Sequence, residues 1–166
     1  MFFEYCPKCG MKLDKKEIGD EGLVPFCLVC EQPHFSFSYP CVICLVVDDA
    51  NNIVLIKQSY VSNNYICVAG FVKQGETIEH TALREVEEET GLKVLDVEYI
   101  KSYYYSKRDN LMFGFVCKVE KAEFSISNEI DKAEWFTLEE AEGLLRKGSI
   151  GQVLLRDYIG NMENKR

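Results

Sequence analysis

Residues 70–92 read GFVKQGETIEHTALREVEEETGL, the most informative stretch of this chain. Gly70 and Gly75 bound a loop, and the residues from 77 to 90 after it have the periodicity of an amphipathic helix. The buried side of this helix is expected to comprise residues three or four positions apart, namely Ala82, Leu83, Val86 and Thr90. Gly91 then stands where a helix C-terminus favours a left-handed residue. The stretch therefore predicts a loop, a helix and a glycine stop.

The predicted helix carries an acidic cluster. Glu85, Glu88 and Glu89 stand at positions i, i+3 and i+4, which places them on one helical face. Like charges at these spacings destabilise an isolated helix by roughly 0.2 to 0.5 kcal/mol per pair, so something must compensate for them. A solvated acidic surface is the usual meaning of such a run. The alternative is a site for a hard cation such as Mg²⁺ or Mn²⁺, which takes oxygen ligands.

The spacing of a wider set of residues favours the cation site. The pattern is Gly70, five residues, Glu76, seven residues, Arg84-Glu85-Val86, one residue, Glu88-Glu89, one residue and Gly91-Leu92. This pattern resembles the Nudix box at each of its defined positions. The resemblance implies an α+β fold, the Nudix α/β/α sandwich with a mixed sheet. It also implies a hydrolase that uses Mg²⁺ or Mn²⁺ to cleave the pyrophosphate bond of a nucleoside diphosphate linked to another moiety.

The same resemblance implies roles for individual residues. It implies that the catalytic cation is held by four carboxylates and one main-chain carbonyl, those of Glu85, Glu88, Glu89, Glu129 and Ala69. Arg84 would fix the carboxylate geometry by ion pairing, and Glu76 would be a framework acid. We expect the carboxylates to lie on the exposed face of the helix. Glu88 and Glu129 are the two candidates for the general base.

Features outside the box resemble a zinc-ribbon-containing branch of the family, the bacterial NADH pyrophosphatases. They are two C-x-x-C sequences before the box, typical of a zinc ribbon, and the segments 68–72, 128–136 and 148–150. That group has a Ser-Gln-Pro-Trp-Pro-Phe-Pro array followed by Leu-Met, whereas this chain reads SYYYSKRDNLM over 102–112. The resemblance therefore implies a dinucleotide such as NAD(H), held by an altered array. The residues expected to contact the substrate are Tyr103, Tyr105, Lys107 and Arg108.

Cysteine spacing predicts a second metal site. Two C-x-x-C knuckles, formed by Cys6, Cys9, Cys27 and Cys30, each present two thiolates on one tight turn, as tetrahedral zinc requires. Gly10 suits the positive φ of such a turn. The pair Cys41 and Cys44 has the same spacing but lies in an apolar strand, where residues i and i+3 point to opposite faces. We therefore predict a structural Zn²⁺ at the knuckles and small core roles for Cys41, Cys44, Cys67 and Cys117.

The chain divides into two predicted domains, a zinc ribbon over 1–35 and a Nudix hydrolase domain over 36–166. The ribbon has little apolar content, so its metal must replace a core. In the second domain, strands out of strict alternation with helices predict a mixed sheet packed between helices. The predicted strands cover 42–47, 53–58, 65–68, 94–105, 111–119 and 134–136, and the later helices cover 138–147 and 149–159.

The net charge and the N-terminal sequence limit the binding partners and the cellular location expected for this protein. A formal net charge of −8 opposes general nucleic-acid binding, which is built largely from cations that neutralise phosphates. The NAD-type cap of an RNA end stays open as a substrate. No basic and apolar leader begins the sequence and no 18-residue apolar window occurs in it, so we expect a cytoplasmic protein that does not enter a membrane.

Two alternatives to an NAD(H)-cleaving enzyme stay open. One is a pyrophosphatase for ADP-ribose or another nucleotide sugar. The other is a non-catalytic Nudix module that senses a nucleotide and docks a protein through its ribbon. The full set of acidic residues argues against the sensor, because a binding module does not need every metal ligand. The sequence leaves open whether the chain forms a homodimer.

Overall fold

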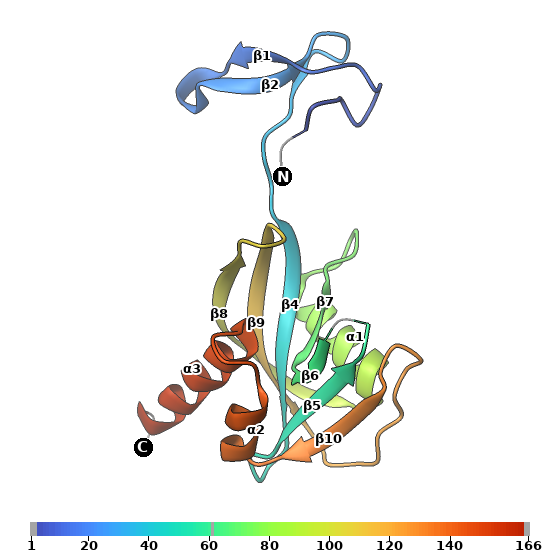
Figure 1. Cartoon of the computed structure of the whole chain (residues 1–166), viewed down its shortest axis with the longest axis vertical. Helices are drawn as coiled ribbons and strands as arrows, with labels where there is room; N and C mark the ends of the chain where they lie inside the picture. The colour runs from blue at the N-terminus through green and yellow to red at the C-terminus, as the bar shows by residue number, and fades with distance from the viewer. Residues whose placement is uncertain (1–2, 61, 165–166) are drawn as a thin grey trace. The chain divides into compact units, whose positions relative to one another are not determined.

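The computed structural model of the chain describes residues 3–60 and 62–164 (Figure 1). It divides into two compact units, Met1–Tyr39 and Pro40–Arg166. In the described part of the chain, no helix has both the length and the apolar character needed to cross a bilayer.

The first unit is a small sheet beside a cluster of cysteines. Its strands β1 (Asp14–Glu17), β2 (Leu23–Cys27) and β3 (Gln32–Pro33) are antiparallel, and a 3-10 turn (Gly19–Glu21) joins the first two. Gly10 closes the first knuckle with a φ of 75°, as its position predicts, and donates its N–H to the Cys6 carbonyl at 2.8 Å. The sulfur atoms of Cys6, Cys9, Cys27 and Cys30 all lie within 4.8 Å of one another.

The second unit is a sheet between helices, and the α+β fold class is confirmed. The five strands of its main path run in the order β10-β5-β4-β9-β8, while β6 pairs with β5 and β7 pairs with β4. Their bounds are β4 (Tyr39–Val47), β5 (Ile53–Gln58), β6 (Ser62–Ile66), β7 (Val68–Phe71), β8 (Val94–Tyr105), β9 (Asn110–Val119) and β10 (Lys132–Phe136). The helices are α1 (Ile78–Thr90), α2 (Leu138–Leu144) and α3 (Ile150–Asn164).

Alternation along the central strand β4 divides the core into two layers. Val42, Cys44 and Val46 belong to one cluster with Ala82 and Val86 of α1. The intervening Ile43, Leu45 and Val47 belong to the other cluster, with Leu154 and Leu155 of α3. Because successive strand residues point to opposite faces, one apolar run supplies both layers. The four cysteines outside the knuckles, Cys41, Cys44, Cys67 and Cys117, are all buried, which confirms their core roles.

The segment predicted as a single strand over 65–68 is instead two strands that meet at Cys67. β6 pairs with β5 through Ile56 and Ile66, whereas β7 pairs with β4 through Cys44 and Val68. The chain thus changes partner strand at Cys67, which local periodicity does not reveal. As a result, Gly70 and Phe71 lie in a strand rather than in the predicted loop.

Helix α1 begins and ends where the sequence predicts. The Thr77 hydroxyl caps its first turn by accepting the His80 N–H at 3.2 Å. Gly91 ends it with a φ of 72° and donates its N–H to the Glu87 carbonyl at 2.9 Å. The main chain of Ser125 lies against this glycine, because its N–H donates to the Thr90 carbonyl at 2.9 Å. The end of α1 therefore also anchors the stretch that leads towards β10.

Replacing Gly91 by Ala should destabilise the second unit. A Cβ at this position would lie 2.6 Å from the Ser125 Cβ and 2.9 Å from its carbonyl oxygen, in a conformation that L residues disfavour. We expect Gly91→Ala to lower the free energy of unfolding by about 1 to 3 kcal/mol. Urea denaturation followed by the fluorescence of Trp135, the single tryptophan, measures the change.

Gly160→Ala is the matched control, because Gly160 lies in helix α3 with nothing within 4 Å of an added Cβ. It should stabilise the unit by about 0.5 to 1 kcal/mol, as alanine is the better helix former. Equal effects of the two substitutions would contradict this account of the helix end.

Candidate active site

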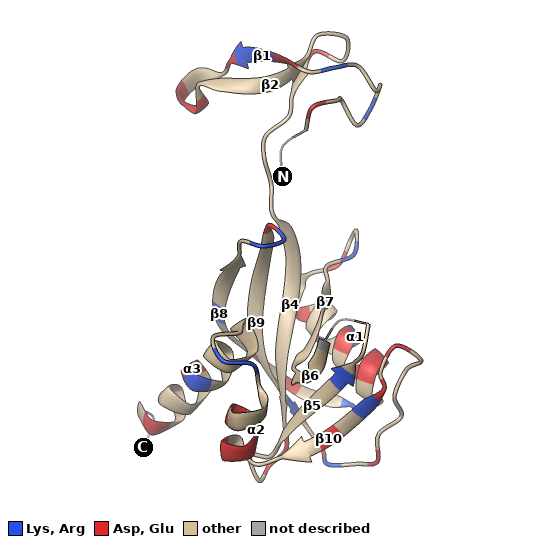
Figure 2. Cartoon of the chain, in the orientation of Figure 1, with Lys and Arg blue, Asp and Glu red and all other residues tan. Residues whose placement is uncertain are grey.

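The acidic residues of α1 differ widely in exposure. Figure 2 shows acidic segments on α1 and on the stretch that leads into β10. The side chain of Glu88 is 53% exposed and that of Glu85 is 12% exposed, while Glu89 as a residue is 6% exposed. The expectation that these carboxylates share an exposed face is therefore wrong for Glu89. It follows Ala82 and Val86 at spacings of seven and three residues, so it lies on the buried stripe of the helix.

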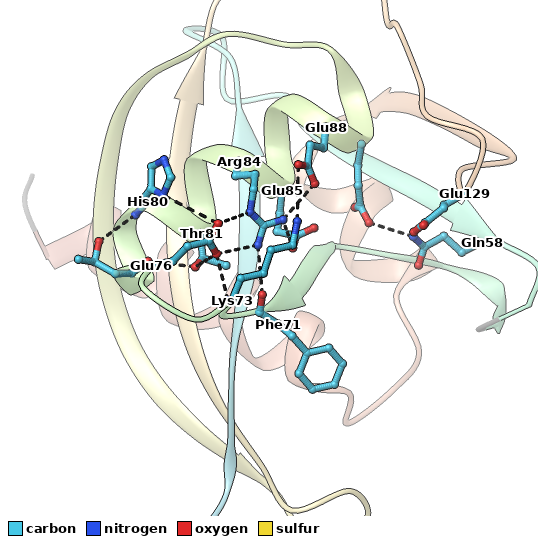
Figure 3. A network of polar contacts seen from close by, with 12 residues as sticks. Gln58, Phe71, Lys73, Glu76, His80, Thr81, Arg84, Glu85, Glu88 and Glu129 are labelled. Atoms are coloured by element: carbon cyan, nitrogen blue, oxygen red, sulfur yellow. Dashed lines mark hydrogen bonds and ion pairs between the residues drawn. The ribbon is translucent and has the colours of Figure 1, made fainter.

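Arg84 links three acidic residues, Glu76, Glu85 and Glu88 (Figure 3). Its guanidinium donates to both carboxylate oxygens of Glu76, at 2.6 and 2.9 Å. Its Nη1 also donates to Glu85 at 2.6 Å and to Glu88 at 3.0 Å. These contacts raise the pKa of Arg84, that with Glu76 contributing most. One cation thus offsets charge on three carboxylates and fixes their orientation.

Glu76 fastens the loop before α1 to the helix. Besides Arg84, its carboxylate accepts the Lys73 N–H at 3.1 Å and the Thr81 hydroxyl at 2.9 Å. These donors, Arg84 first, lower the pKa of Glu76 to about 2. A carboxylate that receives so many donors holds the backbone in place, so the structure is consistent with a framework acid.

The surroundings of the Glu89 carboxyl do not fully accommodate its ionised form. Gln58 at the end of β5 donates its amide to Glu89 Oε1 at 3.0 Å. Oε2 of Glu89 and Nε2 of His34 are the two buried side-chain N or O atoms without a hydrogen-bond partner in residues 3–60 and 62–164. Burial first, and the negative charge of Glu85 second, raise the pKa of Glu89 to about 8. A bound cation would stabilise the ionised form.

Glu85 is held close to β7. A Cβ at Gly70 would lie 2.0 Å from the Glu85 carboxylate carbon, so a side chain at this position would displace the carboxylate. Burial raises the pKa of Glu85 above its ordinary value. Ala69 precedes Gly70 in the same strand and pairs with Ile43 of β4. The site therefore has oxygen donors suited to a hard divalent cation, two of which are buried enough for ionisation to be unfavourable without one.

Glu129 approaches from the stretch between β9 and β10. It is exposed, and its carboxylate accepts the Tyr60 hydroxyl at 3.4 Å. Figure 3 places it beside Gln58. Its negative charge also contributes to the raised pKa of Glu89.

The candidate cation ligands lie in one region of the second unit, but their carboxylate oxygens do not form a compact cluster. In the parts of the chain that are described, the four cysteines of the first unit are the one group of three or more Cys, His, Asp and Glu side chains whose ligand atoms all lie within 4.8 Å. Glu85 and Glu88 are drawn to Arg84, while Glu89 and Glu129 contact the end of β5 through Gln58 and Tyr60.

The predicted substrate-binding residues lie on the β8–β9 hairpin. Tyr103 packs on the α2 and α3 side of the sheet and donates its hydroxyl to Asp157 at 2.8 Å. Tyr105 is half-buried at the end of β8, and Lys107 and Arg108 are exposed in the turn that follows. Because α1 covers the opposite side of the sheet, the structure does not bring Tyr103 together with the carboxylates of α1.

Two residues that contact the acidic site were missed in the sequence. Gln58 shares strand parity with Val54 and Ile56, whose side chains face α1, so a polar residue there was a signal of a polar partner. Tyr60 is two residues further on and gave no signal, since its contact with Glu129 spans 69 residues of sequence.

Comparison with known proteins agrees with the fold. The model of the NUDIX domain matches residues 38–157. The NAD-capped RNA hydrolase NudC of Vibrio vulnificus is 28% identical over 161 residues, which are 96% of this chain and 60% of that protein. The human NAD-capped RNA hydrolase NUDT12 is 33% identical over 157 residues, 88% of this chain and 33% of that protein. The chain thus spans at most about three fifths of the length of these relatives.

A solved structure shares the architecture. The crystal structure of a NUDIX hydrolase from Nitrosomonas europaea superposes with a TM-score of 0.70 at 22% identity. The match covers 98% of this chain and 92% of that one. At this identity the likeness concerns the fold.

The buried carboxyl of Glu89 predicts how stability depends on pH. Folding raises the pKa of this carboxyl group from 4.5 to about 8. Ionising the group therefore costs more free energy in the folded protein than in the unfolded one, so the folded state loses stability as the pH rises from the lower pKa to the higher. In buffer free of Mg²⁺ and Mn²⁺, the free energy of unfolding should therefore fall between about pH 4.5 and pH 8, by on the order of a few kcal/mol.

Glu89→Gln removes this titration, so the variant should lose less stability over the same pH range. The measurement is urea denaturation at several pH values, followed by Trp135 fluorescence. Glu79→Gln, at an exposed position of the same helix, serves as the control and should follow the wild-type profile. Parallel profiles for wild type and Glu89→Gln would show that Glu89 does not titrate in this range.

Proposed function

Because the chain belongs to the Nudix family, whose domain model matches residues 38–157, we propose that it is a divalent-metal-dependent pyrophosphohydrolase. Its substrate is a nucleoside diphosphate linked to another moiety, with NAD(H) as the first candidate. The observation that carries the proposal is the buried Glu89 Oε2, which lacks a partner in the midst of further carboxylates. A solvated acidic surface would leave such an oxygen in water.

Each acidic residue has a place in the proposed reaction. Glu85, Glu88, Glu89 and Glu129, with the carbonyl of Ala69, would hold Mg²⁺ or Mn²⁺. Bound there, the cation offsets the charge of the diphosphate and lowers the pKa of water. Arg84 keeps Glu85 and Glu88 oriented through its Nη1.

Hydrolysis needs one proton acceptor beside the attacking water. As the water oxygen bonds to one phosphorus, a glutamate takes its proton and the bridging oxygen leaves with the other phosphate. A dinucleotide would yield two mononucleotides. Glu88, held by Arg84 and by Lys73 at 3.8 Å, and Glu129, held by Tyr60, are the two candidates for this base.

The substrate proposal draws on the relatives. The two described above are named as NAD-capped RNA hydrolases, so NAD(H) and an NAD-capped RNA end are the candidates to test first. Contacts to the substrate are proposed for Tyr105, Lys107 and Arg108 of the β8–β9 hairpin, and not for Tyr103, whose hydroxyl bonds Asp157 on the α3 side of the sheet. The alternatives are ADP-ribose or another nucleotide sugar as substrate, and a sensing module without catalysis.

A substrate panel tests the proposed activity. With Mg²⁺ or Mn²⁺, the protein should hydrolyse at least one of NADH, NAD⁺, ADP-ribose and diadenosine polyphosphates, with the products separated and quantified. Glu88→Gln and Glu129→Gln should each lower kcat by about a hundredfold or more if they supply charge or accept the proton.

Glu79→Gln is the control for that experiment, because it removes a charge from an exposed position in the first turn of the same helix. It should leave kcat within about twofold, as surface substitutions away from a site are usually tolerated. Turnover that persists after removal of Mg²⁺ and Mn²⁺ would refute the metal-dependent mechanism. Nucleotide binding without turnover on any substrate would favour the sensing module.

For the first unit we propose one structural Zn²⁺ per chain. The Sγ atoms of Cys9 and Cys27 lie 3.5 Å apart, and those of Cys6 and Cys30 lie 3.9 Å apart. Four thiolates fill a tetrahedral zinc site and leave no position for substrate, so the zinc would act in folding and not in catalysis.

Metal analysis of the purified protein should find about one equivalent of zinc per chain, as four cysteines complete one tetrahedral site. Cys9→Ser should remove most of this zinc. Cys41→Ala is the control, since it removes a buried core thiol of the competing C-x-x-C pair and should leave the zinc content unchanged. Zinc that survives Cys9→Ser but is lost in Cys41→Ala would contradict the proposal, because it would place the zinc site at the pair Cys41 and Cys44.

A further inference from the structure

We infer that Gln58 and Tyr60, at the end of strand β5, are positioning residues that set the placement of Glu89 and Glu129 relative to each other. The inference rests on the proposed function and extends it to residues outside the Nudix box. Each of the two residues hydrogen-bonds one of the two carboxylates, at 3.0 Å from Gln58 to Glu89 and at 3.4 Å from Tyr60 to Glu129.

The fold directs Gln58 at helix α1. Val54 and Ile56 precede it at alternate positions of β5 and pack in the cluster that α1 covers. Gln58 follows at the same parity and is 6% exposed, so its amide lies buried at the edge of this layer. The pairing of β5 with β6 is irregular between Ile56 and Gln58, which marks the point where the strand ends.

Gln58 orients Glu89 without neutralising it. An amide donates a hydrogen bond but has no charge, unlike the guanidinium that binds Glu76. Its donation to Glu89 Oε1 fixes the carboxylate plane and leaves Oε2 as the oxygen without a partner. A lysine or arginine in this place would compete with a divalent cation, whereas glutamine leaves the full negative charge available to it.

Tyr60 belongs to a short set of contacts that fastens Glu129 to the same strand. The Asp131 N–H donates to the Lys57 carbonyl at 2.9 Å, and the Asp131 carboxylate accepts the Ser59 N–H. The Tyr60 hydroxyl donates to Glu129 itself. The stretch that carries Glu129 is therefore held at the end of β5 by two main-chain donors and one side-chain donor.

The two carboxylates come from segments that are distant in the sequence. Glu89 is fixed to helix α1, and Glu129 lies 40 residues later, between β9 and β10. The residues from 57 to 60 contact both segments, so they act as a brace between them. Loss of either contact should leave the fold in place and let one carboxylate move away from the other, weakening a cation bound by both.

Mn²⁺ binding to the full chain tests the brace without requiring turnover. Free Mn²⁺ is quantified by electron paramagnetic resonance, and kcat and KM are measured on the best substrate of the panel. Gln58→Met keeps a side chain of similar length without its donor, and Tyr60→Phe removes one hydroxyl. The loss of a charge-assisted bond should weaken Mn²⁺ binding by about tenfold in Gln58→Met and about threefold in Tyr60→Phe. kcat should fall by similar factors, with KM within about twofold of wild type.

Two variants serve as matched controls. Tyr104→Phe removes a tyrosine hydroxyl that donates to an exposed carboxylate, Asp109, at 2.7 Å on the β8–β9 hairpin. Gln152→Met removes a glutamine amide that is also 6% exposed but bonds the Glu142 carbonyl and the Gly148 N–H. Both should bind Mn²⁺ as the wild type does. Circular dichroism and Trp135 fluorescence check that each variant is folded.

The outcomes separate this inference from the proposed function. If wild type binds Mn²⁺ and turns over substrate, and folded Gln58→Met and Tyr60→Phe match it in Mn²⁺ affinity and kcat, the brace is refuted and the proposed function stands. If wild type neither binds Mn²⁺ nor turns over any substrate, both fail. Weakened Mn²⁺ binding in both variants, with wild-type binding in both controls, supports the inference.

Discussion

The charge balance around Arg84 is the interaction on which the candidate site depends. Helix α1 carries like charges at spacings that destabilise an isolated helix, and the guanidinium of Arg84 binds Glu76, Glu85 and Glu88 at once. Glu76 in turn holds the loop that enters the helix through the Lys73 N–H. One side chain therefore joins the loop, the helix and three carboxylates.

Glu89 is not among the three carboxylates whose charge Arg84 offsets. Its buried position distinguishes the candidate site from a solvated acidic surface. It is buried beside the end of β5, where a neutral amide orients it and one oxygen has no partner. Burial penalises its charge, so the folded protein either protonates it or binds a cation there. Arg84 offsets charge on the first set of carboxylates, whereas one oxygen of Glu89 has no hydrogen-bond partner among the described residues. In the proposed function, this oxygen is the one that would meet the divalent cation.

A feature of the fold or of the candidate site could be predicted from the sequence when it depends on residues that are close together in the chain. The span of α1 follows from the Thr77 cap and Gly91, and the knuckle cysteines follow from their spacing, because caps and turns are set by neighbouring residues. The strand change at Cys67 was not predicted, since it depends on which strands pair. The site divides in the same way. Its glutamates could be named from the box pattern, but the burial of Glu89 and its bond to Gln58 required the fold.

The most direct test is an anomalous-diffraction experiment on crystals of the protein soaked in Mn²⁺. The account predicts a manganese peak within ligand distance, about 2.2 Å, of Glu89 Oε2, with an oxygen of Glu85 also coordinated. Full Mn²⁺ occupancy elsewhere in the second unit, with Glu89 Oε2 still buried and without a ligand, would contradict it. In that case the acidic residues of α1 would form a charged surface held together by Arg84, and the proposed hydrolase would lose the observation that carries it.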